Sequence, residues 1–157
     1  MAADTVSSSI RSRMMASVKG KDTKPELAIR SALHRSGFRF RLHRKDLPGK
    51  PDLVFTGRNA VLFVHGCFWH GHDCHLFRWP KSRGDFWREK IVSNIERDRQ
   101  QQQALAEAGW RVGIVWECAL EGKTSLPFEK VIDQCALWLK SNTKSLEVSG
   151  NEERATV

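Results

Sequence analysis

The sequence predicts an α/β fold, an α/β/α sandwich in which helices cover both faces of a central mixed sheet. Short apolar segments typical of strands alternate with longer amphipathic segments typical of helices. The length of 157 residues suits one domain with a substantial core. A single segment rich in Cys and His follows neither period, so we expect one irregular loop attached to the sheet.

The first half of the domain is expected to hold one helix and three strands. Thr23 to Glu26 form a capping box with Pro in the first turn, and Gly37 ends the helix that starts there. The alternation over 38–42 indicates a half-buried strand, and 52–55 indicates a second one. Residues 60–64 are apolar throughout, which is typical of a central strand.

The second half is expected to add a long helix, a fourth strand and a last helix. The long helix spans 85–108, the mostly apolar fourth strand 110–116, and the last helix about 126–140. From residue 141 onward the chain is polar. We therefore expect one domain over 21–140, followed by a disordered polar tail over 141–157.

The charge balance points to a polyanionic partner. Lys plus Arg outnumber Asp plus Glu by 26 to 18, and residues 1–20 are expected to form a basic N-terminal arm. There is no apolar run of about 20 residues that would span a membrane, and the N-terminus lacks the apolar block of a signal peptide. We therefore expect a cytosolic protein whose four Cys are metal ligands or buried thiols, with no disulfides.

The Cys- and His-rich segment offers an unusual density of metal ligands. Zinc prefers thiolate and imidazole, and a structural site needs four such ligands. The fourth ligand is either local or distant, and Cys118, after the fourth strand, would clamp the loop to the sheet. The alternative is a metal-free loop, whereas Cys135 on the apolar helix face is expected to be an inert buried thiol. The local candidates are Cys67, His70, His72, Cys74 and His75.

A second group of residues suits phosphodiester hydrolysis. Asp52 starts a strand, where one carboxylate can hold Mg²⁺ by one or two oxygens. His65 and His70 flank the end of the third strand and suit a general base or a phosphate ligand. Taken alone, Asp52 would be interpreted as a turn or cap residue.

Aromatic residues accompany this group. Phe68 and Trp69 are adjacent in the loop, and Trp87 lies at the start of the long helix. Aromatic side chains near a basic surface can stack on bases or wedge into a base step. The alternative is packing, with Trp87 in the core and Phe68 covering the loop, and composition favours neither.

In their order and spacing, these motifs resemble the very-short-patch repair (Vsr) endonuclease family. The resemblance runs from about Arg11 to Leu139. The most specific part is the His-Gly-Cys-Phe-Trp-His block at 65–70 together with the distant Trp-Glu-Cys at 116–118. The stretches that carry it are 47–52, 64–74, 94–98, 109–112 and 115–118.

The resemblance implies a fold like that of type II restriction endonucleases, with a structural zinc loop and a catalytic Mg²⁺. Asp52 corresponds to the Mg²⁺-binding carboxylate, and the main-chain carbonyl of Val64 to a second ligand. Val64 replaces a hydroxyl residue of the family, which a main-chain ligand tolerates. The positions that correspond to zinc ligands are Cys67, His72, Cys74 and Cys118.

The resemblance also implies roles in catalysis and mismatch recognition. His70 corresponds to the general base, with His65 beside it, and Glu26 to an acidic residue that supports the site through His70. Residues 63–65 read Phe-Val-His where the restriction-enzyme signature has Glu-x-Lys, which fits catalysis by histidine. An aromatic wedge from the major groove and one residue inserted from the opposite groove correspond to Phe68, Trp69, Trp87 and Met15.

The implied activity is a nick 5′ to the T of the T:G mismatch that deamination of 5-methylcytosine leaves in double-stranded DNA. The implied setting is a monomer in the bacterial cytoplasm at the nucleoid, linked to a cytosine-5 DNA methyltransferase and to mismatch-repair proteins. One alternative is a sequence-specific endonuclease on paired DNA. Another is a non-catalytic zinc-stabilised DNA-binding module, which has no need of Asp52, His65, His70 and Glu26 together.

Overall fold

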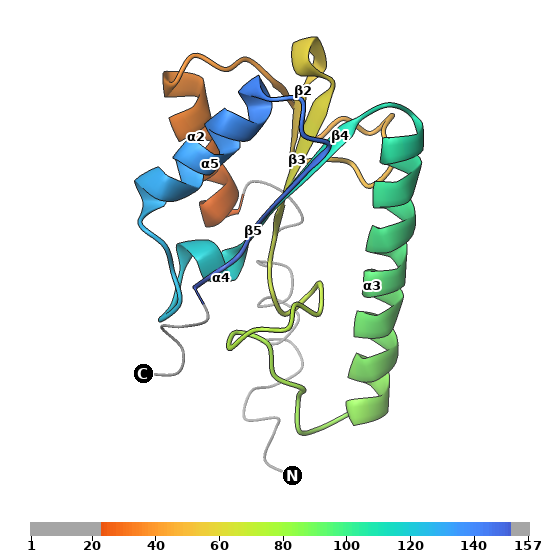
Figure 1. Ribbon diagram of the computed structural model, residues 1–157. Coiled ribbons are helices and arrows are strands. Elements are labelled where there is room, and N and C mark those ends of the chain that lie inside the picture. Colours follow the sequence, from red (N-terminus) through yellow and green to blue (C-terminus); the bar gives the residue numbers. More distant parts are fainter. Residues whose placement is uncertain (1–22, 152–157) are drawn as a thin grey trace.

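The computed structural model describes residues 23–151 and arranges them around a five-stranded mixed sheet (Figure 1). The strand order is β1-β2-β3-β4-β5. Neighbours β1, β2 and β3 run antiparallel, whereas β3, β4 and β5 run parallel. The predicted mixed sheet is therefore confirmed. The strands are β1 Arg41–Leu42, β2 Leu53–Phe55, β3 Ala60–His65, β4 Arg111–Trp116 and β5 Ser145–Val148.

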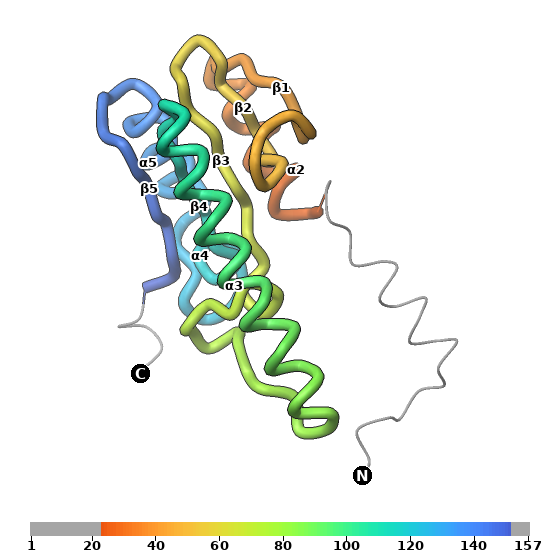
Figure 2. Tube along the Cα trace, turned by 90° about the vertical axis from the view of Figure 1, so that its right-hand side faces the viewer, coloured from red at the N-terminus to blue at the C-terminus, as the bar shows by residue number. Residues whose placement is uncertain are grey.

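Helices cover both faces of this sheet. In Figure 1, α3 lies on one side of the strands, and α2 and α5 lie on the other. Figure 2, turned by 90°, shows α3 running along the sheet in front of it. None of the helices within 23–151 combines the length and apolar character that a membrane span needs. The helices are α2 Lys24–Arg35, the short 3-10 turn η1 Thr56–Arg58, α3 Gly84–Glu107, α4 Glu117–Leu120 and α5 Phe128–Lys140.

The start and end signals of α2 act as the sequence predicts. Thr23 Oγ1 accepts a hydrogen bond from the Glu26 N–H at 3.4 Å, and Pro25 lies in the first turn. Gly37 follows the helix with φ +96°, a conformation in which glycine carries no steric penalty. The capping box therefore places Glu26 at the start of a helix that packs against the sheet.

The predicted strand over 38–42 is wrong for residues 38–40, because only Arg41 and Leu42 pair with β2. Phe38 and Phe40 instead pack edge-on against Phe55, with ring centroids 6.4 and 5.5 Å from it. Their alternation therefore reflects packing on the sheet and is not a strand ladder.

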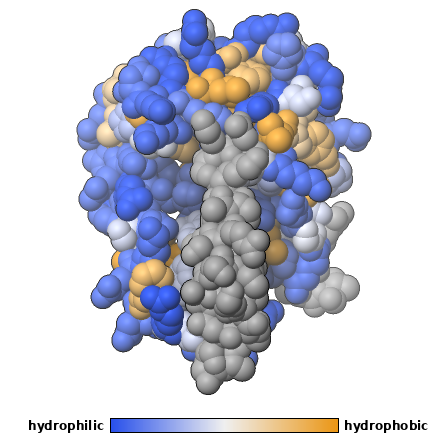
Figure 3. Space-filling view, turned by 180° about the vertical axis from the view of Figure 1, so that it is seen from behind, coloured by the Kyte–Doolittle hydropathy of each residue, from blue (hydrophilic) through white to orange (hydrophobic). Residues whose placement is uncertain are grey.

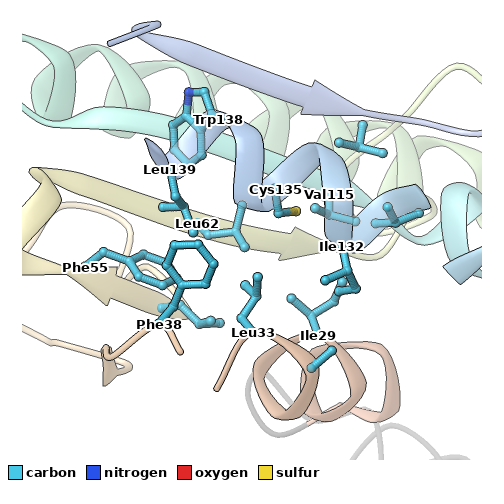
Figure 4. Packing of buried hydrophobic residues seen from close by; sticks show 14 of the residues in the cluster. Ile29, Leu33, Phe38, Phe55, Leu62, Val115, Ile132, Cys135, Trp138 and Leu139 are labelled. Atoms are coloured by element: carbon cyan, nitrogen blue, oxygen red, sulfur yellow. The ribbon is translucent and has the colours of Figure 1, made fainter. Parts of the chain in front are cut away.

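The main core lies between the sheet and the helix pair α2 and α5 (Figure 4). Ile29 of α2 is fully buried, and Trp138 of α5 is 4% exposed. Gly113 of β4 makes this packing possible, because a Cβ there would lie 2.9 Å from the Trp138 ring. A smaller buried cluster on the α3 side includes Leu105 of α3, and it extends to Cys67 and Cys118 at the end of the sheet.

The predicted disorder of the tail is wrong for residues 141–151. Residues 145–148 form β5, which pairs with β4 in parallel register. Val148 is 2% exposed and belongs to the main core. The Leu146–Val148 alternation is a short strand signal among polar residues, and sequence reasoning passed over it. The predicted arm over 1–20, with Met15, lies outside the described residues, as do 152–157.

The face of the molecule opposite to Figure 1 is mostly hydrophilic where its residues are described, with apolar side chains gathered mainly towards one end (Figure 3). The protein carries a formal net charge of +8. A polar, cationic surface of this kind suits a polyanionic partner better than an apolar one.

Candidate active site

The antiparallel pairing of β2 with β3 builds the centre of the site. Asp52 directly precedes β2, and Val64 lies near the end of β3. The register, with Leu53 opposite Leu62, brings the Asp52 carboxylate to the Val64 main chain. The Val64 N–H donates to Asp52 Oδ2 at 2.7 Å, so the carboxylate has a fixed orientation.

A second carboxylate lies beside Asp52. Glu26, in the first turn of α2, is 1% exposed, and Asp52 is 8% exposed. Burial raises the pKa of Asp52 to about 7, and the neighbouring Glu26 adds to the rise, whereas the Val64 N–H opposes it. Two buried carboxylates at one point favour a bound cation, because a cation offsets both the desolvation and the mutual repulsion.

His43 joins this carboxylate pair, and sequence analysis did not single it out. Its Nε2 lies 2.6 Å from Glu26 Oε2 and 3.9 Å from Asp52 Oδ1. Glu26 Oε2 also accepts from Arg30 at 3.2 Å. Glu26 therefore has hydrogen bonds to His43 and Arg30, and its expected support of the site through His70 stays a prediction.

Two stacked histidines face the carboxylates. The rings of His65 and His70 lie 3.7 Å apart at an angle of 4°. His70 Nδ1 lies 2.5 Å from Asp98 Oδ2 of α3. Burial lowers the pKa of His65 well below its usual value, with His70 adding to the effect, so His65 is neutral at physiological pH. Asp98 belongs to the 94–98 stretch of the family resemblance, but sequence reasoning gave it no role.

One cavity of about 640 Å³ joins these groups. Glu26, Asp52, His65 and His70 line it together with Phe68 and Trp69. The expected catalytic residues therefore open onto the same space as Phe68 and Trp69, whereas Trp87 is not among the lining residues. Three further lining residues that sequence reasoning missed are Lys90, Asn94 and Glu117.

A larger hollow of about 1010 Å³ lies near the start of β4, but its chemistry differs. The Arg111 guanidinium there donates to the carbonyls of Trp138 and Leu139 at 2.8 and 3.1 Å. This guanidinium satisfies the end of α5, so the hollow offers a poorer hydrolytic site than the carboxylate and histidine cavity.

The structure brings one imidazole and three thiols into a closed set. All four ligand atoms lie within 4.8 Å of one another, and Cys118 supplies the distant member. Burial raises the pKa of the Cys67 and Cys118 thiols, which leaves them protonated unless a cation binds. Three sulfurs and one nitrogen in a closed set fit a tetrahedral metal ion. The set is Cys67, His72, Cys74 and Cys118.

The groups around this set hold it in place. The main-chain N–H groups of Cys118 and Gly150 donate to Cys67 Sγ and Cys118 Sγ at 3.3 and 3.2 Å. Trp116 stacks on the His72 ring at 4.0 Å. His75 lies outside the set, with its Nδ1 3.3 Å from Thr124 Oγ1. Cys135 is buried in the main core, as expected, and the four Cys within residues 23–151 are free thiols.

The aromatic residues of the loop and of α3 form one cluster. Ring centroids lie 5.2 Å apart for Phe68 and Trp69, 5.4 Å for Phe68 and Trp87, and 5.8 Å for Trp69 and Trp87. All three side chains are half-buried. Asn94 Nδ2 donates to the Trp69 carbonyl at 2.9 Å, so α3 braces the loop from behind.

The close approach of the loop to α3 depends on Gly71. Gly71 has φ +61°, and a Cβ there would lie 2.5 Å from the Ile95 side chain and 2.9 Å from that of Ile91. Only glycine combines this backbone conformation with this contact. The loop is therefore seated against the helix as well as against the sheet.

Comparison with known proteins gives a consistent set of relatives. A family model described as DNA mismatch endonuclease Vsr matches residues 3–76. The chain is 56% identical over 117 residues to the Type II nicking enzyme V.XorIIP of Xanthomonas oryzae pv. oryzae, covering 74% of this chain and 86% of that protein. It is 42% identical over 146 residues to DNA mismatch endonuclease Vsr of Escherichia coli (strain K12), covering 93% and 94%. With this similarity over nearly its whole length, the chain belongs to the Vsr family of DNA mismatch endonucleases.

Proposed function

We propose that this protein is a Mg²⁺-dependent DNA endonuclease that nicks one strand 5′ to the T of a T:G mismatch arising from deamination of 5-methylcytosine, and so initiates very short patch repair. One observation carries the proposal: a buried carboxylate pair and a stacked histidine pair share a cavity with Phe68 and Trp69. Hydrolytic groups and base-stacking groups are thus available to the same DNA step. The family membership points to the same substrate class.

The donor set fits a hard cation. Asp52 offers a carboxylate, and we assign the Val64 main-chain carbonyl as a second ligand, with Glu26 as the neighbouring acid. Magnesium bound there would stabilise charge on the phosphate and lower the pKa of a bound water. The raised pKa of metal-free Asp52 supports this assignment, because a cation restores the ionised form.

His70 is the group we assign to take the proton of the attacking water. Asp98 holds its Nδ1, which leaves Nε2 to accept the proton. The stacked neutral ring of His65 fixes the plane of His70 and adds no competing charge. As the water oxygen bonds to phosphorus, the P–O3′ bond breaks, which leaves a 3′-hydroxyl and a 5′-phosphate.

We assign Zn²⁺ to the set of three thiolates and one imidazole, with a structural role. A closed four-ligand site leaves no position for a substrate. Its place between the loop and the end of β4 braces the segment that carries Phe68, Trp69 and His70. This zinc loop on a mixed sheet between helices supports a fold of the restriction-endonuclease type.

The proposed setting follows from the proposed substrate. The enzyme acts as a monomer on double-stranded DNA in the bacterial cytoplasm at the nucleoid. A cytosine-5 DNA methyltransferase creates the sites at which the mismatch arises, and mismatch-repair proteins are the expected partners.

A second candidate function is a sequence-specific endonuclease on paired DNA. The relative V.XorIIP is named a Type II nicking enzyme, a name that specifies a nick but no mismatch and so leaves room for this activity. The same carboxylates and histidines would serve both reactions, so the catalytic site does not separate them.

The deciding experiment compares T:G and fully paired duplexes. The protein is incubated with Mg²⁺ and a panel of 5′-labelled duplexes in varied sequence contexts, and each strand is resolved separately. We expect a nick only in the T strand of T:G duplexes and only with Mg²⁺. Cleavage of paired duplexes at equal rate would favour the second candidate, and no cleavage in any context would overturn both.

A further inference from the structure

His43 lies at the carboxylate pair and has no role in the function proposed above. Its side chain is 18% exposed, and its Nε2–H donates to the buried Glu26 Oε2 at 2.6 Å. The same nitrogen lies 3.9 Å from Asp52 Oδ1. One imidazole N–H thus lies next to both carboxylates.

The backbone holds His43 in an unusual conformation. Its φ is 48°, in the left-handed region that non-glycine residues rarely adopt. Its N–H donates to the Asp52 carbonyl at 3.2 Å, which ties this residue to the start of β2. A strained backbone persists where its surroundings over-determine it, and it often accompanies a functional role of the side chain.

The orientation of Glu26 depends on hydrogen bonds from two side chains. His43 and Arg30 both donate to Oε2, so the carboxylate is held from one side. Arg30 is in the same helix, one turn beyond Glu26, whereas His43 comes from the segment that precedes β2. The imidazole is therefore a donor that ties Glu26 to the segment before β2.

We infer that His43 is a positioning residue of the cation site, which holds the Glu26 carboxylate in place beside Asp52 through its Nε2–H bond. The inference rests on the proposed function in taking Asp52 as the cation-binding carboxylate and Glu26 as the neighbouring acid. Partners that orient metal-binding groups typically change metal affinity or activity by about 10- to 100-fold when removed. His43 thus belongs to the metal site without touching the substrate.

The test uses Mn²⁺ as the probe, bound to the full-length protein without DNA and followed by electron paramagnetic resonance. We expect His43→Ala to weaken Mn²⁺ binding by about 10-fold, the lower end of the usual range. His43→Gln, whose amide N–H reaches a similar position, should recover most of the affinity. His34→Ala is the matched control, because His34 is an exposed histidine of α2.

A double-mutant cycle with Glu26→Gln then tests the route of the effect. If His43 acts through Glu26, His43→Ala should have little further effect on Mn²⁺ binding once Glu26 is Gln. Circular dichroism checks that each variant is folded.

Three results would overturn the inference. They are equal Mn²⁺ affinity in wild type and His43→Ala, no recovery in folded His43→Gln, or full additivity with Glu26→Gln. Failure of the proposed function is a separate observation, the absence of a nick in T:G duplexes by the wild type, and leaves the Mn²⁺ comparison intact.

Discussion

Asp52 combines nearly complete burial with a proposed role, cation binding, that needs a negative charge. Removal of a carboxylate from water disfavours its ionised form, and Glu26 adds repulsion. The folded, metal-free protein therefore holds this group in an unfavourable environment. Such a residue favours cation binding at the expense of fold stability, as active sites often do.

The first prediction is that Asp52→Asn stabilises the metal-free protein above pH 7. The pKa of Asp52 is about 7 in the folded protein against 3.8 ordinarily. The folded state therefore binds more protons between these values, and the stability that Asp52 contributes below about pH 4 is lost as pH rises through 7. In EDTA we expect Asp52→Asn to raise the free energy of unfolding by about 2 kcal/mol at pH 8 and by less at pH 5.

Urea denaturation at the two pH values measures this difference. Asp46→Asn is the control, since Asp46 is an exposed carboxylate paired with Arg44. A loss of stability in Asp52→Asn at pH 8 would show that the buried charge is already compensated without a metal.

The second prediction concerns His70. His70→Ala should lower the single-turnover nicking rate by about 10²- to 10⁴-fold, the usual contribution of a positioned general base. Asp52→Ala should abolish nicking, since it removes the proposed metal ligand. Both variants should bind T:G duplexes nearly as well as wild type, measured by titration in Ca²⁺. Nicking at the wild-type rate by both would place the active site elsewhere.

At the residue scale, motif and resemblance predicted part of the site only. The expected residues Asp52, His65 and His70 do line one cavity. Asp98 lies 28 positions from its partner His70, and His43 lies 17 positions from its partner Glu26. Both pairs join elements that meet only through tertiary packing. No local period marks such partners, and so the sequence could not reveal them.

At the element scale, β5 shows how a short strand escapes detection. Its four residues include two apolar ones, and it lies in a polar stretch. Its stability comes from the ladder with β4 and from the burial of Val148, both of which are long-range. The pattern of α5 was predicted well because its five buried residues recur at helical spacing, which is a strong local signal.

The third prediction links the segment after β5 to the metal loop. A Cβ on Gly150 would lie 2.3 Å from Thr124 Oγ1 and 2.7 Å from the Cys118 carbonyl. Gly150→Ala should therefore displace the N–H that donates to Cys118 Sγ. We expect faster loss of zinc to a chelator, by about 10-fold, as for other groups that orient metal ligands.

Two controls bracket this outcome. A Cβ at Gly57 would meet open space, so Gly57→Ala should retain zinc as the wild type does. Cys118→Ala removes a ligand and should lose both zinc and fold stability, whereas Cys135→Ala should keep the metal. Elemental analysis that finds no zinc in soluble, active wild type would contradict the assignment.

At the scale of the whole molecule, the sheet brings three groups of residues together at the C-terminal ends of β3 and β4. The ends of β3 and β4 lead into the metal loop, the stacked histidines and the aromatic cluster, while α3 braces them from one face. The α/β/α arrangement was predictable because alternating strand and helix patterns have few ways to bury their apolar faces. The convergence of these three groups of residues was not predictable, since it depends on strand order and register.

The last prediction concerns how the whole molecule selects a mismatch. Insertion of aromatic side chains unstacks a base step for a few kcal/mol, and the cost is least at a mismatch. The Trp69 carbonyl is held by Asn94, and the loop supplies three of the four proposed metal ligands, so Trp69 can enter the stack without deformation of the loop. Trp69→Ala should therefore weaken binding to T:G duplexes much more than to paired duplexes. Trp110→Ala, in the hollow near the start of β4, is the control.

Basic side chains should affect DNA binding differently from Trp69, because their contacts to phosphates are independent of base sequence and sensitive to salt. Replacement of Lys or Arg within residues 1–20 should weaken binding to both duplexes and flatten its salt dependence. Binding titrations at two salt concentrations separate the two effects, because the Trp69 loss should change little with salt. An equal loss for T:G and paired DNA in Trp69→Ala would mean that the aromatic cluster only packs the loop, and that mismatch selection arises from contacts to the base edges.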